Sequence, residues 1–228
     1  MADGRRNDVL VDALVAHFET HRTVIARILE SLRLILIDSP DLARHIHSFR
    51  WRVKSPDHLR EKLHRKAARQ GGALDITETT LFERVTDLAG FRILHLHTTQ
   101  FPAIDQAIRN ALDENRYTIL EGPEARTWDD EYREYFEGIG VKTVKSERMY
   151  TSVHYVVEAN TKTKYTAEIQ VRTLAEELWG EVDHLINYPN PSPVLACKEE
   201  IKVLARITSS CTRLTDSIFR SHDESLKR

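Results

Sequence analysis

The chain has 228 residues, of which 41% are hydrophobic and 30% charged, and its formal net charge is -2. This balance is typical of a globular protein and excludes the disordered and fibrous classes. No apolar run approaches the roughly 20 residues of a membrane span, and the first residues lack the layout of a secretory signal, so we expect a cytoplasmic protein with no membrane partner. Cys197 and Cys211 have no spacing typical of zinc sites, and we interpret both as packing residues.

Charge is unevenly distributed along the chain. Residues 44–69 are rich in Lys, Arg and His, with only Asp57 and Glu61 as acidic residues, which makes this stretch a candidate surface for polyphosphate or nucleic acid. Residues 121–137 are rich in Asp and Glu, and we expect a solvated, mobile loop there. The alternative is that both stretches are exposed faces that neutralise each other.

The first part of the chain is expected to be largely helical. Apolar residues recur at helical spacing over 8–38, which predicts a long N-terminal helix that ends at Ser39 and Pro40. Ser55 and the proline after it have the pattern of an N-cap and first position, so a helix with a basic polar face is predicted over 56–69.

The middle of the chain alternates helix and strand signals. A short helix around 78–84 is followed by the strand FRILHLHT over 91–98, a helix over 101–114 and a short strand over 117–120. Further on, residues 190–193 separate a helix that begins after Thr173 from a last helix over about 194–222. The pattern favours an α/β (α+β) fold with a mixed sheet flanked by helices.

Two neighbouring segments, YTSVHYVVE over 150–158 and YTAEIQVRT over 165–173, alternate between two faces like strands. The short polar connection over 160–164 is typical of a hairpin, so the chemically rich faces are expected to lie side by side. The residues on these faces are Tyr150, Ser152, His154 and Val156 in the first segment and Thr166, Glu168, Gln170 and Arg172 in the second.

Several of these side chains have both a functional and an ordinary structural interpretation. Asp87 lies on a tight turn before a strand and could hold a divalent cation or cap the turn. Glu168 could form a structural salt bridge, or act as a metal ligand or general base. His154 could be a half-buried structural histidine or part of a site. Arg52, Lys54 and Lys62 could together grip the phosphates of one ligand.

Five strings occur in the order RVKSPDHLREKL, DLAGFRI, YTSVHYVV, EIQVRT and WGEVDHLINY. Together they resemble the synthetase domain of the RelA/SpoT family over roughly residues 50–190. The resemblance implies a nucleotidyltransferase-like fold and a Mg²⁺-dependent transfer of pyrophosphate from ATP to the ribose 3′-hydroxyl of GDP or GTP. The products of that reaction are AMP and the alarmones ppGpp and pppGpp.

The resemblance also implies roles for individual residues. Arg52 and Arg92 would sandwich the adenine of ATP, and two lysines, Lys54 and Lys62, would bind its phosphates. Tyr150 would stack on the acceptor purine. Asp87 and Glu168 would hold Mg²⁺, with Glu168 also taking the proton of the attacking hydroxyl. The remaining acceptor and phosphate contacts would come from His154, which we count as catalytic, and from Gln170, Arg172 and Asn187.

Some positions depart from the family pattern. The stacking tyrosine is flanked by Met149 and Thr151, where the family usually has glycine and a lysine or arginine. Asp183 replaces a glutamate in the helix motif, and Asp57 or His58 occupies the place of a serine in the first motif. The alternatives are therefore a toxic synthetase that acts on the tRNA 3′ end or on adenine nucleotides, a catalytically weak nucleotide-binding regulator, and a scaffold without nucleotide chemistry.

The expected organisation is one globular unit in three parts. An N-terminal helical extension covers 1–40, the synthetase-like domain covers 41–190, and a C-terminal helix lies within 191–228. The chain has no room for the hydrolase domain of long family members, so it resembles a single-domain small alarmone synthetase. Its terminal helices could form a homo-oligomer, or the apolar stripe of the last helix could instead close the core of the monomer.

Overall fold

The computed structural model describes residues 2–71, 73–188 and 190–227, and a mixed six-stranded sheet organises the fold. Two strand pairs, β2 with β6 and β3 with β4, are parallel, and the other three are antiparallel. The α/β class predicted from the sequence is confirmed. The strands, in their order across the sheet, are β1 (Ser48–Val53), β2 (Ala89–His95), β6 (Thr166–Thr173), β5 (Ser152–Glu158), β3 (Thr118–Thr127) and β4 (Lys142–Lys145).

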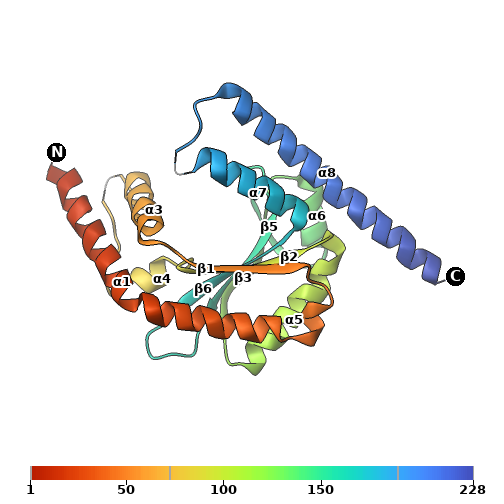
Figure 1. The fold of residues 1–228 in the computed structure, drawn as a ribbon, viewed down its shortest axis with the longest axis horizontal. Coiled ribbons are helices and arrows are strands. Elements are labelled where there is room, and N and C mark those ends of the chain that lie inside the picture. The colour runs from red at the N-terminus through yellow and green to blue at the C-terminus, as the bar shows by residue number, and fades with distance from the viewer. Residues whose placement is uncertain (1, 72, 189, 228) are drawn as a thin grey trace.

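One face of the sheet is covered by two helices, α1 (Ala2–Ile37) and α5 (Phe101–Glu114) (Figure 1). The strands direct their apolar residues to this side, among them Phe91 and Ile169, which are fully buried. Tyr155 is also fully buried, and its hydroxyl donates a hydrogen bond of 2.7 Å to Asp105 Oδ1 of α5. Because neighbouring residues of a strand point to opposite faces, burial on this side leaves the polar residues on the other.

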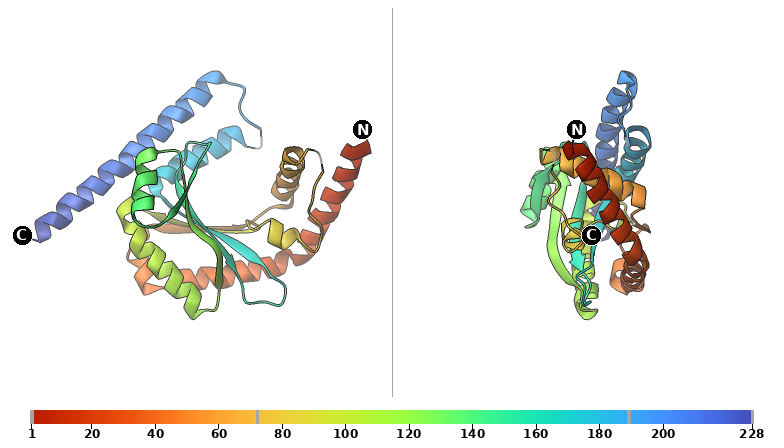
Figure 2. Two further views of the ribbon diagram at one scale, coloured as in Figure 1. Left: turned by 180° about the vertical axis from the view of Figure 1, so that it is seen from behind. Right: turned by 90° about the vertical axis from the view of Figure 1, so that its left-hand side faces the viewer.

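The opposite face is flanked at its two ends. Helix α3 (Pro56–Arg69) stands at one end, and α7 (Leu174–Asn187) with α8 (Leu195–Leu226) stands at the other (Figures 1 and 2). Helix α3 begins as the sequence predicts, because Ser55 Oγ accepts a hydrogen bond of 3.2 Å from His58 N. The remaining helical segments are short: α2 (Pro40–Ala43), α4 (Leu81–Arg84), η1 (Thr98–Gln100) and α6 (Asp130–Gly138).

The expectation of a mobile acidic loop over 121–137 is wrong. Strand β3 runs on to Thr127, and α6 follows, capped by Asp129, whose Oδ1 accepts a hydrogen bond of 3.0 Å from Glu131 N. Tyr132 and Phe136, one helical turn apart, are buried and anchor α6. The acidic side chains mostly occupy the exposed sides of these elements. The high fraction of charged residues therefore led to the wrong prediction of a loop.

Strand β3 is also longer than the short strand predicted over 117–120, and it contains an irregularity at Gly122. This glycine has φ of 97°, and a Cβ atom there would lie 2.3 Å from the carbonyl oxygen of His154. Only glycine therefore lets β3 approach β5 this closely. Two strands, β1 and β4, had not been identified as strands from the sequence.

Long terminal helices were predicted and are confirmed by α1 and α8. Both ends of α3 and α5 agree with the predicted ranges. In the described part of the chain, no helix has the length and apolar character needed to cross a membrane.

Candidate functional site

Two rows of side chains cross the uncovered face of the sheet. Residues paired across neighbouring strands point to the same face, so each row forms a continuous band. The first row consists of Arg50, Arg92, Gln170, His154 and Glu124. The second row consists of Arg52, Gly90, Glu168, Val156 and Glu121. The prediction that the polar residues of β5 and β6 share one face is confirmed.

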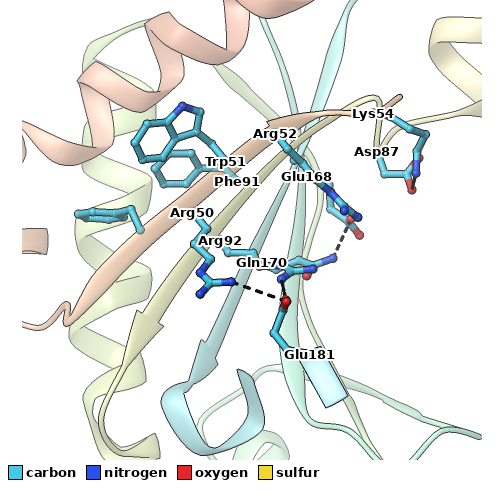
Figure 3. Close-up of a pocket in the computed structure, with 12 residues that line it drawn as sticks. Arg50, Trp51, Arg52, Lys54, Asp87, Phe91, Arg92, Glu168, Gln170 and Glu181 are labelled. Carbon is cyan, nitrogen blue, oxygen red and sulfur yellow. Dashed lines mark hydrogen bonds and ion pairs between the residues drawn. The ribbon is translucent and has the colours of Figure 1, made fainter. Parts of the chain in front are cut away.

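These rows open into two adjoining cavities. The first, of about 500 Å³, lies over β1, β2 and β6 beside α7 (Figure 3). The second, of about 390 Å³, lies over β3, β5 and β6 beside α3 and α4. Three residues, Asp87, Glu168 and Gln170, line both cavities. The two carboxylates, which lie far apart in the sequence, therefore converge on one cleft.

Asp87 is held by two lysines. Its Oδ2 lies 3.1 Å from Lys54 Nζ, and its Oδ1 lies 2.7 Å from Lys62 Nζ. Burial favours a higher pKa for Asp87, but the two lysines outweigh it and hold the pKa below its usual value. Burial lowers the pKa of Lys54 despite the nearby carboxylate. Asp87 Oδ1 is buried, and the ion pair with Lys62 is its closest polar contact.

Glu168 is oriented by its neighbours on the same face. Its Oε1 lies 2.8 Å from His154 Nδ1, and its Oε2 accepts a hydrogen bond of 2.9 Å from Gln170 Nε2. Burial favours a higher pKa for Glu168, but the contacts with His154 and Gln170 hold the pKa below its usual value. His154 Nε2 in turn lies 2.6 Å from Ser152 Oγ. The carboxylate is therefore ionised and fixed in direction.

Arg92 is tied to α7 by two glutamates. Its Nη1 donates a hydrogen bond of 2.7 Å to Glu181 Oε1 (Figure 3). It also donates one of 3.2 Å to Glu177 Oε1. Arg50 Nη1 lies 3.4 Å from Glu177 Oε1, and Arg172 is also ion-paired with Glu177. These pairs fix Arg50 and Arg92 of the first cavity against α7, which forms its wall.

The structure brings most of the predicted site residues together. The first cavity is lined by Arg52, Lys54 and Arg92, and the second by Lys62, Tyr150 and His154, in addition to the three shared residues.

Two predicted residues line neither of these cavities. Arg172 is buried beneath α7, where a Cβ at Gly180 would lie 2.7 Å from its Nη1. Asn187, at the end of α7, donates a hydrogen bond of 2.8 Å to Asp183 Oδ1.

Sequence reasoning missed several residues of both cavities. In the first cavity these are Arg50 and Glu181, and in the second they are Lys66, Arg84, Glu124 and Arg126. Arg50 continues the alternation of Arg52 and Lys54, so this pattern could have revealed it. Arg126 belongs to the stretch that was taken for a loop, and its side chain is instead fixed 3.2 Å from Glu124 Oε1.

The donor set fits Mg²⁺. This ion prefers oxygen ligands and is usually held by one or two carboxylates together with water and substrate phosphates. Asp87 and Glu168 supply two ionised carboxylates at the shared wall of the cavities. Among the described residues, no group of three or more His, Cys, Asp or Glu is placed to hold a metal ion by itself.

Comparison with known proteins identifies the family. Residues 51–192, more than half of the chain, match the family described as a region found in RelA / SpoT proteins. No curated protein sequence matches the chain.

Solved structures share the fold. A GTP pyrophosphokinase family protein from Streptococcus pneumoniae has a TM-score of 0.62 and 22% identity, and the alignment covers 91% of this chain and 93% of that one. Small alarmone synthetase 1 from Bacillus subtilis bound to AMPCPP has a TM-score of 0.60 and 18% identity, with 92% and 99% covered. The same synthetase bound to its product pppGpp has a TM-score of 0.59 and 21% identity, with 92% and 98% covered. The chain thus belongs to the RelA/SpoT family and has the fold of the small alarmone synthetases.

Proposed function

We propose that the protein is an ATP-dependent pyrophosphokinase that modifies the ribose 3′-hydroxyl of GDP or GTP. The observation that carries the proposal is the pair of adjoining cavities with Asp87 and Glu168 in their shared wall. A transfer between two nucleotides requires two binding sites that meet at the reacting atoms. The family match and the neighbours solved with AMPCPP and with pppGpp support the same reaction.

The first cavity is the proposed donor site. Arg52 and Arg92 would hold the adenine, and Lys54 and Lys62 would neutralise the phosphates, which carry concentrated negative charge. Mg²⁺, held by Asp87 and Glu168, would supply further charge neutralisation when bound. In the absence of a ligand, Lys54 and Lys62 lie against Asp87, so the phosphates would compete with a carboxylate for the same cations.

The proposed chemical step is the one that the resemblance to the RelA/SpoT family implies. The acceptor 3′-oxygen attacks the β-phosphorus of ATP, and a new oxygen–phosphorus bond forms. The bond between the β-phosphorus and the oxygen that bridges to the α-phosphate breaks, and AMP leaves with that oxygen. Glu168 takes the hydroxyl proton, since it is ionised and held in direction by His154 and Gln170.

The second cavity is the proposed acceptor site, where Tyr150 would stack on the purine. One observation favours an alternative acceptor that has no 5′ polyphosphate, the tRNA 3′ end. Thr151 takes the place where the family usually has a cation, and it is buried with its Oγ1 2.8 Å from Thr127 Oγ1. It therefore contributes no charge toward a 5′ polyphosphate, and such charge would have to come from Lys66, Arg84 or Arg126.

An acceptor screen tests the proposal. Purified protein is incubated with Mg²⁺, ATP labelled in the β- and γ-phosphates, and one of GDP, GTP, ADP, ATP alone or tRNA. We expect label on the 3′ position of GDP or GTP and an equal amount of AMP. Label on tRNA or adenine nucleotides alone would establish the alternative acceptor. Binding of nucleotides without label on any acceptor would identify a regulatory homologue instead.

We also propose that the protein assembles with copies of itself through its terminal helices. The outer side of α8 exposes a row of apolar residues, Val203, Ile207, Leu214 and Ile218. Such a row on a solvent-exposed helix is typical of an interface. Light scattering coupled to size-exclusion chromatography would show an oligomer, and a monomeric mass at micromolar concentration would contradict the proposal.

A further inference from the structure

A second, smaller hydrophobic cluster lies beside the proposed acceptor cavity. Its buried members are Trp179 of α7 and Ile201 and Ala205 of α8. The half-buried residues packed against it are Trp128, Met149, Tyr150, Val182 and Leu204. The cluster therefore joins α8 to the segment that carries the predicted stacking tyrosine. Helix α8 lies outside residues 51–192, the region that matches the family.

The ring of Tyr150 is stacked on Trp179. The ring centroids are 6.2 Å apart and the planes differ by 8°, which is an offset parallel stack. Trp179 is only 4% exposed, and its Nε1 donates a hydrogen bond of 3.0 Å to the carbonyl oxygen of Ile201. The backbone of α8 thus fixes the orientation of the indole, and the indole fixes the phenol ring.

The chain on the other side of Tyr150 is fixed as well. Thr151 N donates a hydrogen bond of 3.0 Å to Glu176 Oε2, and Thr151 Oγ1 lies 2.8 Å from Thr127 Oγ1. Tyr150 also lines the second cavity. One face of its ring is thus occupied by Trp179 while the residue borders the space where the acceptor would bind.

We propose that α8 is a positioning element for the acceptor, and that it acts through Trp179 and Leu204 to hold Tyr150 as a preformed platform for a purine. This inference rests on the proposed function. Stacking of a base on an aromatic ring stabilises binding, and a ring that is already ordered loses little conformational entropy when the base arrives. The purine would become the third layer of a stack that begins at Trp179 of α7, whose orientation α8 fixes. Among the described residues, no member of this cluster lines the first cavity, so the affinity for ATP should depend little on α8.

The first test compares two leucines of the same helix. Leu204 packs against the cluster, whereas Leu226 is 74% exposed. In Leu204→Ala we expect the KM for GDP to rise about tenfold, which is within the range that loss of an ordered stack allows, with the KM for ATP unchanged within about twofold. Leu226→Ala is the matched control and should retain both constants.

The second test changes the stacking of Trp179 on Tyr150 to two different extents. Trp179→Phe keeps an aromatic ring and loses the hydrogen bond to Ile201, whereas Trp179→Leu loses both. We expect a smaller rise in the GDP KM for the phenylalanine variant, about threefold, than for the leucine variant, about tenfold or more. Calorimetric titration with GDP should reproduce the order, and circular dichroism with thermal unfolding shows that each variant is folded.

The outcomes separate the inference from the proposed function. If Leu204→Ala raises the KM for ATP as much as that for GDP, or changes neither, α8 does not position the acceptor. The same conclusion follows if Trp179→Phe and Trp179→Leu are equally impaired. If wild-type protein neither binds GDP nor modifies any acceptor, the proposed function itself is wrong, and the inference about α8 is then wrong as well.

Discussion

The two cavities meet at the same carboxylates but are built in different ways. On the donor side, one stretch of chain supplies the cations: Arg52 lies in β1, Lys54 directly after it, and Lys62 in α3, where the two cavities adjoin. The acceptor side is assembled from β3, β5 and the segment before β5, and it is supported from behind by α7 and α8. A site built on one local motif keeps its geometry through helix and strand spacing. A site assembled from distant segments depends on tertiary packing.

The largest expected effect comes from the residue that both sides share. Glu168→Gln removes the ionised carboxylate and should lower kcat by about 10²–10⁴-fold, because the general base and a metal ligand are lost together. The side-chain volume is nearly unchanged, so the unfolding transition should stay close to that of the wild type. Initial rates of AMP release measure the effect.

A matched control is Glu83→Gln, an exposed glutamate of α4 that lines neither cavity. Its rate should equal that of the wild type. Retention of the wild-type rate in Glu168→Gln would show that the two cavities do not share their chemistry.

The second prediction uses pH to separate the two sides. Burial raises the pKa of Glu176 to about 7, although Thr151 N and Arg172 oppose the rise. Because the folded pKa exceeds the unfolded value of 4.5, this group stabilises the protein fully below about pH 4.5 and loses that contribution as pH rises to about 7. The difference corresponds to at most about 3 kcal/mol. On the donor side, the pKa of Asp87 is lowered from its usual value of 3.8, so this group changes the free energy of unfolding only at pH values below about 3.8.

Urea unfolding of Glu176→Gln and of the wild type at about pH 5 and about pH 8 tests the raised pKa of Glu176. The variant remains uncharged, so the free-energy difference between the two proteins should change over this range. His95, whose pKa burial lowers to about 4, produces a slope of opposite sign, but it does so in both proteins and cancels in the difference. Parallel curves for the two proteins would contradict the raised pKa.

The third prediction is that single substitutions weaken the binding of ATP and of GDP separately. Arg92→Ala should raise the KM for ATP about tenfold, since a stacked and ion-paired guanidinium is lost, and leave the KM for GDP nearly unchanged. Tyr150→Leu should raise the KM for GDP about tenfold and leave the KM for ATP nearly unchanged. Steady-state kinetics with each substrate varied in turn gives both constants. A common change in both constants for either variant would mean that the cavities are not distinct sites.

The smallest predicted effect concerns the orientation of Arg92. Glu181→Gln weakens the 2.7 Å ion pair but keeps a hydrogen-bond acceptor, so the KM for ATP should rise only about threefold. The KM for GDP should not change. Glu199→Gln, at an exposed position of α8, serves as the control. An effect on GDP as large as that on ATP would argue for a general disturbance of α7.

Secondary structure was predicted correctly from the sequence where hydrophobic periodicity is strong, and wrongly where many charged residues surround the few apolar ones. The helices over 56–69 and 101–114 have the predicted ends because their caps and prolines act locally. The acidic stretch over 121–137 was misjudged because its helix is anchored by two buried aromatic residues, Tyr132 and Phe136, among many charges. The contacts that bury those residues come from other parts of the chain.

The sequence by itself determined the ingredients of the site. Alternation in β5 and β6 places Glu168, Gln170 and His154 on one face, and the order of five motifs indicates the RelA/SpoT family, which the match to residues 51–192 confirms. These properties depend on spacing along one segment, so they can be read locally. Only the tertiary structure decided that Asp87 meets Glu168 and that α8 supports Tyr150, because both depend on how distant segments pack across the sheet.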